Sequence, residues 1–219
     1  MQRHTQEAEN LWLAKALWDL HAVRFGDFSL GRSTVHSPVY VNTRRIISAP
    51  RVLRRAARTI VKEIEADQGR LRPRFEPFDL VAGIPFGGLH IATAFSLATN
   101  RPMIYTQPKQ DHRNYVIEGA YEPNQSVMLL DDLITTGGSI LDTAKVLKDE
   151  GLRVTDVMVL VDRGVGATAR LKAQGYRLSS VLTLEVMLNY YLSMRKIDES
   201  IHRKCIDFIA QQRATYGEG

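Results

Sequence analysis

Two adjacent carboxylates followed by a loop of hydroxyl-bearing and glycine residues form the segment of the chain best suited to chemistry. Asp131 and Asp132 follow the short apolar run 127–130, and the loop 135–139 (Thr-Thr-Gly-Gly-Ser) leads into a helical pattern. In open α/β sheets, ligands bind at the carboxyl ends of the strands. Glycines let a ligand approach the backbone, hydroxyls donate hydrogen bonds, and a helix N-terminus offers free N–H groups. The loop is therefore suited to a phosphate group.

The carboxylates of Asp131 and Asp132 would repel a phosphate unless they face another part of the ligand. Ribose hydroxyls or a hydrated Mg²⁺ ion would satisfy this condition. A helix-capping turn is the alternative interpretation, but the complete run 127–139 favours a ligand site. The glycine fingerprints of P-loop NTPases and of dinucleotide-binding domains do not occur in the sequence, so neither class is indicated.

Alternating strand and helix patterns from residue 78 onward must position this segment. We expect strands at 78–82, 102–105, 126–130, 154–161 and 181–184. We expect helices at 89–97, 139–150, 167–174 and over most of 184–212, and a polar stretch at 106–124. The run 127–130 is apolar without alternation, as in a central strand covered on both faces. These patterns predict an α/β fold with a central parallel sheet flanked by helices.

The first part of the chain fits this alternation least. An amphipathic helix is expected from Leu11, followed over 25–41 by short extended pieces with turns. A further helix is expected to begin near Pro50, a residue suited to a first helical turn. We therefore predict an N-terminal helix and hood segment at residues 1–45 and a core with a C-terminal helix at residues 46–219.

The composition indicates a folded chain with a real core. The 219 residues are 44% hydrophobic and 24% charged, which excludes a disordered or fibrous chain. The formal net charge of +5 is compatible with an anionic partner without identifying it. The single cysteine, Cys205, excludes an internal disulfide and a cysteine cluster for zinc. Because neither a signal peptide nor a membrane helix is recognised, we expect a cytoplasmic protein with no membrane partner.

The segment 127–139 resembles the binding motif for phosphoribosyl diphosphate (PRPP) in type I phosphoribosyltransferases. Nearly the whole chain resembles orotate phosphoribosyltransferases, in the form found as the transferase half of UMP synthase. The segments that carry this resemblance are 25–30, 37–40, Arg44 with 48–50, 83–86, 117–119 and 159–163. The decarboxylase half of UMP synthase would need a further domain, for which 219 residues leave no room.

The resemblance implies a pentosyltransferase of pyrimidine biosynthesis. In the family reaction, N1 of orotate displaces diphosphate from C1 of PRPP through an oxocarbenium-like transition state, which gives orotidine 5′-phosphate. The cofactor implied is Mg²⁺, carried by PRPP near Asp131 and Asp132 with no direct protein ligand. A non-catalytic PRPP- or nucleotide-binding paralogue and a phosphoribosyltransferase for another base are the alternatives.

The resemblance also assigns the residues that bind the two substrates. Asp131 and Asp132 would hold the ribose hydroxyls, and the loop 135–139 the 5′-phosphate. The residues implied for PRPP are Asp131, Asp132, Leu133, Ile134, Thr135, Thr136, Gly137, Gly138, Ser139, Phe86, Gly87 and Arg32. Those implied for orotate are Tyr40, Val41, Thr135 and Arg163. Core packing is the alternative for Tyr40, and a surface ion pair with Asp162 is the alternative for Arg163.

The segment 106–113 departs from the family pattern. In the family, a mobile loop closes lysines and an arginine over the diphosphate, often in the neighbouring subunit of a dimer. When the Asp-His pair of this segment is aligned with that of the family loop, only His112 matches a family residue. Lys109 and Arg113 are cations at positions shifted from those of the family's cations. We take His112, Lys109 and Arg113 as the catalytic candidates, and expect a homodimer with the loop 106–120 near the partner's active site. Gly87 stands where many bacterial members have a lysine.

Arginines also gather on one face of the helix expected from Pro50. Some proteins with the phosphoribosyltransferase fold bind RNA, so the face from Arg51 to Lys62 is a candidate RNA surface. No aromatic stacking residues interleave with these arginines. The pattern favours a solvated helix face, and we do not expect a nucleic-acid partner.

Overall fold

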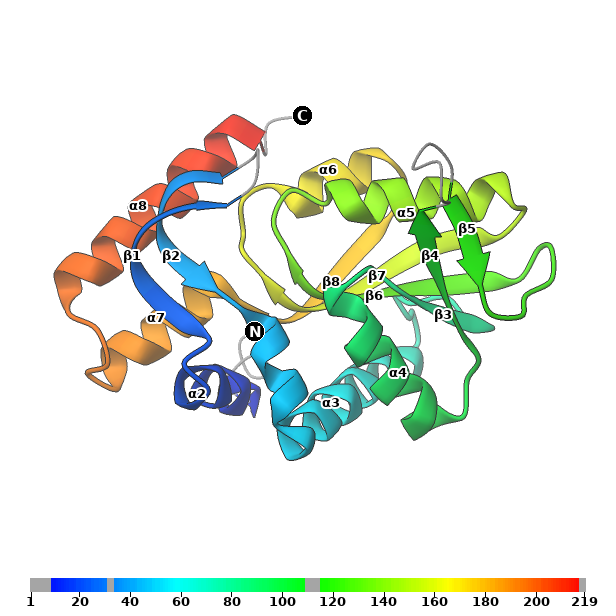
Figure 1. The fold of residues 1–219 in the computed structure, drawn as a ribbon, viewed down its shortest axis with the longest axis horizontal. Helices are drawn as coiled ribbons and strands as arrows, with labels where there is room; N and C mark the ends of the chain where they lie inside the picture. Colours follow the sequence, from blue (N-terminus) through cyan, green and yellow to red (C-terminus); the bar gives the residue numbers. More distant parts are fainter. Residues whose placement is uncertain (1–8, 31–33, 109–114, 217–219) are drawn as a thin grey trace.

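Two separate sheets organise the chain in the computed structural model (Figure 1), which describes residues 9–30, 34–108 and 115–216. The smaller sheet pairs β1 (Val23–Leu30) with β2 (Thr34–Val41) in antiparallel orientation. The larger sheet has six strands in the order β5-β4-β3-β6-β7-β8. Its strands are β3 (Leu80–Gly83), β4 (Met103–Pro108), β5 (Tyr115–Glu118), β6 (Ser126–Ile134), β7 (Arg153–Asp162) and β8 (Arg177–Thr183).

Helices cover both faces of the six-stranded sheet (Figure 1). On one face lie α5 (Gly138–Asp149) and α6 (Ala167–Ala173), and on the other α3 (Pro50–Gln68) and α4 (Gly87–Thr99). Successive side chains of β6 point to opposite faces: Leu129 packs in the α5–α6 layer, and Met128 and Leu130 pack in the α3–α4 layer. The prediction that 127–130 is buried on both faces is confirmed.

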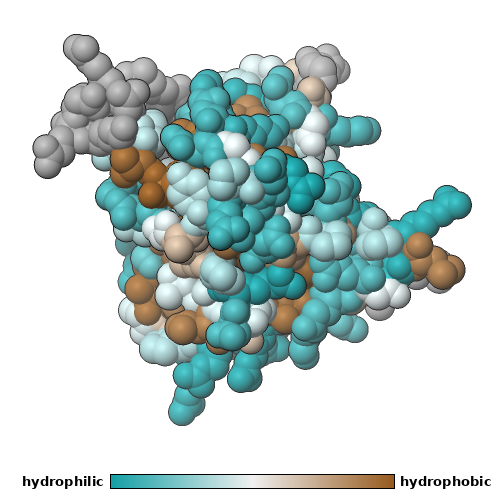
Figure 2. All heavy atoms as spheres, turned by 90° about the vertical axis from the view of Figure 1, so that its right-hand side faces the viewer, coloured by the Kyte–Doolittle hydropathy of each residue, from teal (hydrophilic) through white to brown (hydrophobic). Residues whose placement is uncertain are grey.

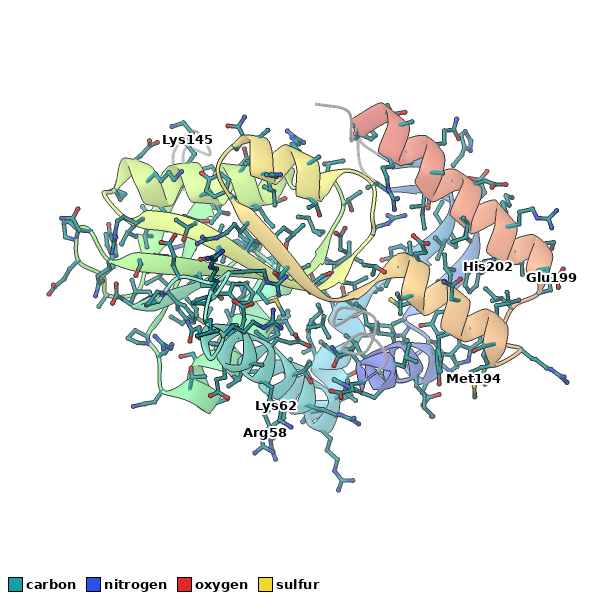
Figure 3. The ribbon with its side chains drawn as sticks, turned by 180° about the vertical axis from the view of Figure 1, so that it is seen from behind. Arg58, Lys62, Lys145, Met194, Glu199 and His202 are labelled. Atoms are coloured by element: carbon teal, nitrogen blue, oxygen red, sulfur yellow. The ribbon has the colours of Figure 1, made fainter. Side chains whose placement is uncertain are left out.

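The amphipathic pattern of α3 explains its position. The helix begins at Pro50 as predicted, and it buries Ile60 and Ile64 against the core. Most of its charged side chains lie on the opposite face, where Arg58 and Lys62 point away from the sheet (Figure 3), whereas Asp67 in the last turn is buried. The burial of the apolar stripe supplies the main force that holds such a helix on a sheet.

One edge of the large sheet differs from the prediction. No strand was predicted within the polar stretch 106–124, but β4 extends to Pro108 and residues 115–118 form β5. β5 pairs with β4 in antiparallel orientation, so the sheet is mixed and its other four pairings are parallel. A short edge strand has only a weak sequence pattern of its own, because its formation depends on pairing with another strand.

The C-terminal region is mostly helical, as predicted for 184–212, but it is divided into two helices. α7 (Leu184–Ser193) and α8 (Glu199–Tyr216) are separate helices. Arg195 between them has a left-handed backbone with φ of 53°, which stops a helix. Asp198 then accepts a hydrogen bond from the Ile201 N–H at 2.9 Å and so caps α8. Figure 3 shows the corner between Met194 and Glu199.

The N-terminal elements attach to the core along its edge. α2 (Leu11–Asp19) packs Leu13 and Leu17 into the main core, and the Tyr191 hydroxyl of α7 donates to the Ala14 carbonyl oxygen at 2.8 Å. The β1–β2 hairpin lies beside α8 (Figure 1). The division at residue 45 stays a prediction.

The surface at the β5 end of the sheet is largely hydrophilic. Figure 2 shows its hydrophobic side chains in small groups among hydrophilic ones. Among the helices of the described ranges, none has the length and apolar character needed to cross a membrane.

Candidate active site

The order of the strands places a crevice between β3 and β6. The chain continues from β3 to β4 on one side and from β6 to β7 on the other, while β3 and β6 are parallel neighbours. Such a reversal of strand order leaves an opening at the carboxyl ends of the two strands. Gly83 at the end of β3 lies opposite Leu130 in β6, so the segments that follow these residues meet there.

A cavity of about 650 Å³ lies at the end of β6. It is lined by Asp131, Leu133, Ile134, Thr135, Thr136, Gly137, Gly138, Ser139, Ile140 and Asp142. Gly137 has a left-handed backbone with φ of 79°, which glycine adopts without steric cost, and α5 begins at the next residue. A Cβ atom added to Gly138 would meet no atom within 4 Å. The loop therefore has free space at the N-terminus of a helix, as an anion site requires.

The two carboxylates lie within a strand rather than after it. β6 continues to Ile134 because β7 pairs with it along this length, with Asp131 opposite Val159 and Leu133 opposite Val161. The expected strand end at residue 130 was therefore too early. Asp131 is only 8% exposed, and burial together with the neighbouring Asp132 carboxylate raises the pKa of Asp131 well above its ordinary range.

The segment after β3 packs directly against these carboxylates. A Cβ atom on Gly87 would lie 2.1 Å from Oδ1 of Asp132, and one on Gly88 would lie 2.3 Å from the Leu130 carbonyl oxygen. Only glycine permits both approaches. Any side chain at position 87 would displace Asp132. A lysine, which many bacterial members have at this position, would therefore not fit here. The Pro85–Phe86 peptide bond is cis, and the Phe86 side chain is 76% exposed.

Arg163 lies beneath the β1–β2 hairpin and is only 4% exposed. Its Nη2 donates to the Ser37 hydroxyl at 3.0 Å and to the Val39 carbonyl oxygen at 3.4 Å. Its backbone N–H donates to the carbonyl oxygen of Ile134 at 3.1 Å, which brings Arg163 to the end of β6. Within the described ranges Arg163 forms no ion pair, so the alternative of a surface pair with Asp162 does not hold.

The guanidinium of Arg163 has a buried Nε atom with no hydrogen-bond partner among the described residues. Burial lowers the pKa of this side chain. A buried cation without a counter-charge is costly, because it loses its hydration without compensation. The arrangement therefore fits an anionic or carbonyl-bearing ligand beside Arg163.

Tyr40 and Val41 lie at the end of the same hairpin. The Tyr40 ring is half-buried and lies 5.7 Å from the Phe28 ring, measured between ring centroids, and Val41 is 8% exposed. The next residue, Asn42, has a buried Oδ1 atom for which the described part of the chain offers no hydrogen-bond partner. Of the residues predicted to bind orotate, Thr135 lines the 650 Å³ cavity, whereas Tyr40, Val41 and Arg163 do not, so these three form a separate group beside it.

Four predicted site residues lie outside the described residues: Arg32, Lys109, His112 and Arg113. The strands that flank 109–114 are described. Thr106, at the position where the family has an arginine, is 2% exposed within β4 and offers no cation. The Gln107 side chain donates a hydrogen bond to Glu118 across the β4–β5 pair.

Sequence reasoning missed two residues that hold the site together. Thr43 donates a hydrogen bond to Asp132, and Ser37 accepts one from Arg163. Ser37 was noticed only as part of a resembling segment. The partners in these pairs are 89 and 126 residues apart, so no local pattern could have indicated either contact.

Comparisons with known proteins agree on one family. No protein-family model matches the chain. The chain is 39% identical over 190 residues to an orotate phosphoribosyltransferase of Chlamydia caviae, which covers 84% of this chain and 86% of the relative. It is 34% identical over 197 residues to an orotate phosphoribosyltransferase of Caenorhabditis elegans, which covers 89% of this chain and 83% of the relative. Among solved structures, the UMP synthase of Leishmania donovani superimposes with a TM-score of 0.80 at 34% identity, over 92% of this chain and 42% of that longer one.

Proposed function

The chain belongs to the orotate phosphoribosyltransferase family, and we propose that it transfers the 5-phosphoribosyl group of PRPP to N1 of orotate. The products are orotidine 5′-phosphate and diphosphate, and the reaction belongs to pyrimidine biosynthesis. One observation carries the proposal: the cavity at the end of β6 combines a buried carboxylate, Asp131, with the glycine and hydroxyl loop at the start of α5. These are the groups that a phosphorylated ribose needs.

PRPP binds in this proposal with its 5′-phosphate at the loop 135–139. The backbone N–H groups at the start of α5 and the hydroxyls of Thr135, Thr136 and Ser139 donate to the phosphate oxygens. Asp131 and Asp132 accept hydrogen bonds from the ribose hydroxyls. Positive charge grows on the ribose in an oxocarbenium-like transition state, and nearby carboxylates stabilise that charge.

Orotate binds in this proposal beside Arg163, Tyr40 and Val41, with Thr135 at its edge. The unused Nε of Arg163 supports this assignment, because orotate carries a carboxylate and ring carbonyl oxygens that can accept from it. Ser37 and Val39 hold the guanidinium in place, so little reorganisation accompanies binding.

The leaving diphosphate lies in this proposal at the Phe86–Gly87 loop, with Lys109, His112 and Arg113 supplying cationic donors. Bound together with PRPP, Mg²⁺ would neutralise negative charge that grows on the diphosphate. Asp131 and Asp132 fit a cation held next to the sugar, because carboxylate oxygens suit Mg²⁺. Burial and, secondly, repulsion by the Asp132 carboxylate raise the pKa of Asp131, and a nearby cation would relieve the repulsion.

A homodimer completes the proposal, with the loop 106–120 near the partner's active site. The apolar groove between α3 and α4 supports this assembly: its volume is about 640 Å³, and Leu97 at its edge is 82% exposed. Arg54 and Glu65 also line the groove, so opposite charges of two copies can meet across a two-fold axis. A cytoplasmic location is part of the same proposal.

The decisive experiment follows orotate absorbance in the presence of PRPP and Mg²⁺. We expect orotate consumption that stops on chelation of Mg²⁺, and lower kcat for Lys109→Ala and for Arg113→Ala. Replacement of orotate by other bases tests specificity. Absence of turnover with retained calorimetric binding of PRPP would reject the enzyme and leave the PRPP-binding alternative.

A further inference from the structure

Thr43 connects the hairpin to the ribose side of the site. It is the first residue of the short 3₁₀ helix η1 (Thr43–Ser48), which follows β2, and it is 2% exposed. Its hydroxyl Oγ1 donates to Oδ2 of Asp132 at 2.5 Å. The contact is short and charge-assisted, the stronger kind of hydrogen bond in proteins.

The other oxygen of the same carboxylate is held by packing. Oδ1 of Asp132 occupies the space that a Cβ atom on Gly87 would take, at 2.1 Å from that position. The Asp132 backbone N–H also donates to Oδ1 of Asp131 at 2.8 Å. Asp132 is therefore fixed between η1 on one side and the start of α4 on the other.

We propose that Thr43 is a positioning residue for PRPP binding, which acts by holding the Asp132 carboxylate in one orientation. The inference rests on the proposed function of Asp132 as a ligand of the ribose. A carboxylate that is already fixed loses less rotational entropy when the ribose hydroxyls bind, so affinity improves through preorganisation.

The placement of Thr43 adds a connection between the two substrates. Tyr40 and Val41, which belong to the proposed orotate group, end β2 two residues before Thr43. The same short segment therefore contributes to the base side and, through Thr43, orients a carboxylate on the ribose side. Loss of the Thr43 hydroxyl should weaken the affinity for PRPP rather than the affinity for orotate.

The test compares Thr43→Val, which keeps the shape and removes the hydroxyl, with Thr43→Ser, which keeps the hydroxyl. PRPP with Mg²⁺ is titrated calorimetrically into each variant, and kcat and both KM values are measured. For Thr43→Val we expect the Kd and KM of PRPP to rise about 10-fold, as for the loss of a hydrogen bond to a charged group. The KM of orotate should stay near the wild-type value, and Thr43→Ser should restore PRPP binding.

A double-mutant cycle separates positioning from a general structural effect. In the Asp132→Asn background, Thr43→Val should have little further effect on PRPP affinity, because the carboxylate that it orients is absent. Equal PRPP affinity of Thr43→Val, Thr43→Ser and wild type would overturn the inference, as would additive losses in the cycle. If Thr43→Val does not fold, Thr43→Ala takes its place in the same cycle.

Calorimetric PRPP binding tests the role of Thr43 separately from transferase activity. PRPP binding is measured without turnover, so a wild type that binds PRPP but consumes no orotate would reject the transferase and leave the Thr43 comparison decisive. A wild type that does not bind PRPP would overturn both.

Discussion

At the scale of single residues, Asp131 shows how a binding group can lower the stability of the fold. The carboxylate is buried beside Asp132, and both circumstances disfavour its ionised form. Ligands with hydroxyl groups or a cation would compensate this cost only when they are bound.

Replacement of this carboxylate should therefore raise stability and weaken PRPP binding. The pKa of Asp131 in the folded protein lies above its ordinary value of 3.8, so the folded state holds this proton more tightly than the unfolded state. The free energy of unfolding is therefore higher at low pH and falls as pH rises through the pKa of the folded state. We expect Asp131→Asn to raise the Tm, with a larger gain at pH 7 than at pH 4. A gain of about 1 kcal/mol corresponds to roughly 2–4 °C for a chain of this size.

Thermal unfolding at both pH values, with PRPP calorimetry, checks this prediction. Asp142→Asn is the matched control, because Asp142 also lines the cavity but follows the start of α5. A lower Tm for Asp131→Asn at pH 7 would contradict the assignment of a destabilising carboxylate.

Arg163 should determine the affinity for the base rather than for PRPP. We expect Arg163→Met to raise the KM of orotate about 10- to 100-fold, since it removes a charged donor from the proposed base site. The Kd of PRPP should change little, because Arg163 does not line the cavity at the end of β6. Steady-state kinetics and calorimetry measure the two effects separately, and a loss confined to PRPP would show that the substrate assignment is wrong.

At the scale of elements, the site depends on how the ends of β3 and β6 meet. Local patterns predicted β6, α5 and the start of α3, because apolar runs, glycines and a first-turn proline lie within single segments. They failed for β5, whose pairing with β4 is antiparallel, and they did not locate the break within the correctly predicted helical region of α7 and α8. They also ended β6 too early, since its last residues are strand only because β7 pairs with them.

Two glycines at these element ends should respond differently to alanine. A Cβ atom on Gly138 meets no atom within 4 Å, so Gly138→Ala should fold as well as wild type but weaken PRPP binding about 10-fold by filling the phosphate space. Gly87→Ala should lower the Tm as well, because its Cβ atom would overlap Asp132. Calorimetry and thermal unfolding of both variants check this contrast, and unchanged PRPP affinity in Gly138→Ala would exclude the loop as the phosphate site.

At the scale of the whole molecule, the exposed face of α4 should control assembly. Phe86 and Leu97 are 76% and 82% exposed and are eleven residues apart, close to three helical turns, so they lie along one side of the helix. Leu97 also borders the groove between α3 and α4, where Leu53, Val61 and Ala94 add apolar surface of the kind that another protein can cover.

We expect Leu97→Glu to shift the protein toward monomers, because burial of a leucine side chain contributes about 2 kcal/mol and a buried unpaired charge costs more. Light scattering after size exclusion measures the mass. Leu71→Glu is the matched control, since Leu71 is fully exposed outside this face. An unchanged dimer in Leu97→Glu would place the interface elsewhere, and a monomeric wild type would reject the dimer itself.

The amino-acid sequence by itself indicated a phosphorylated sugar as the ligand and most of the elements of the core. The run from Val127 to Ser139 is continuous in the chain, so its chemistry and its local structure could be inferred without a partner segment. Arg163 and Tyr40 were indicated by resemblance alone, since each is an ordinary residue until its surroundings are known.

Only the tertiary structure decided how these groups act on one another. It placed Thr43 on Asp132, Ser37 on Arg163, and Gly87 against a carboxylate. It also buried Asp131 and left Nε of Arg163 without a hydrogen-bond partner within the described ranges. The physical reason is that hydrogen bonds, desolvation and steric contact depend on distance in space, and these pairs are 45 to 126 residues apart in the chain, where local sequence patterns carry no information.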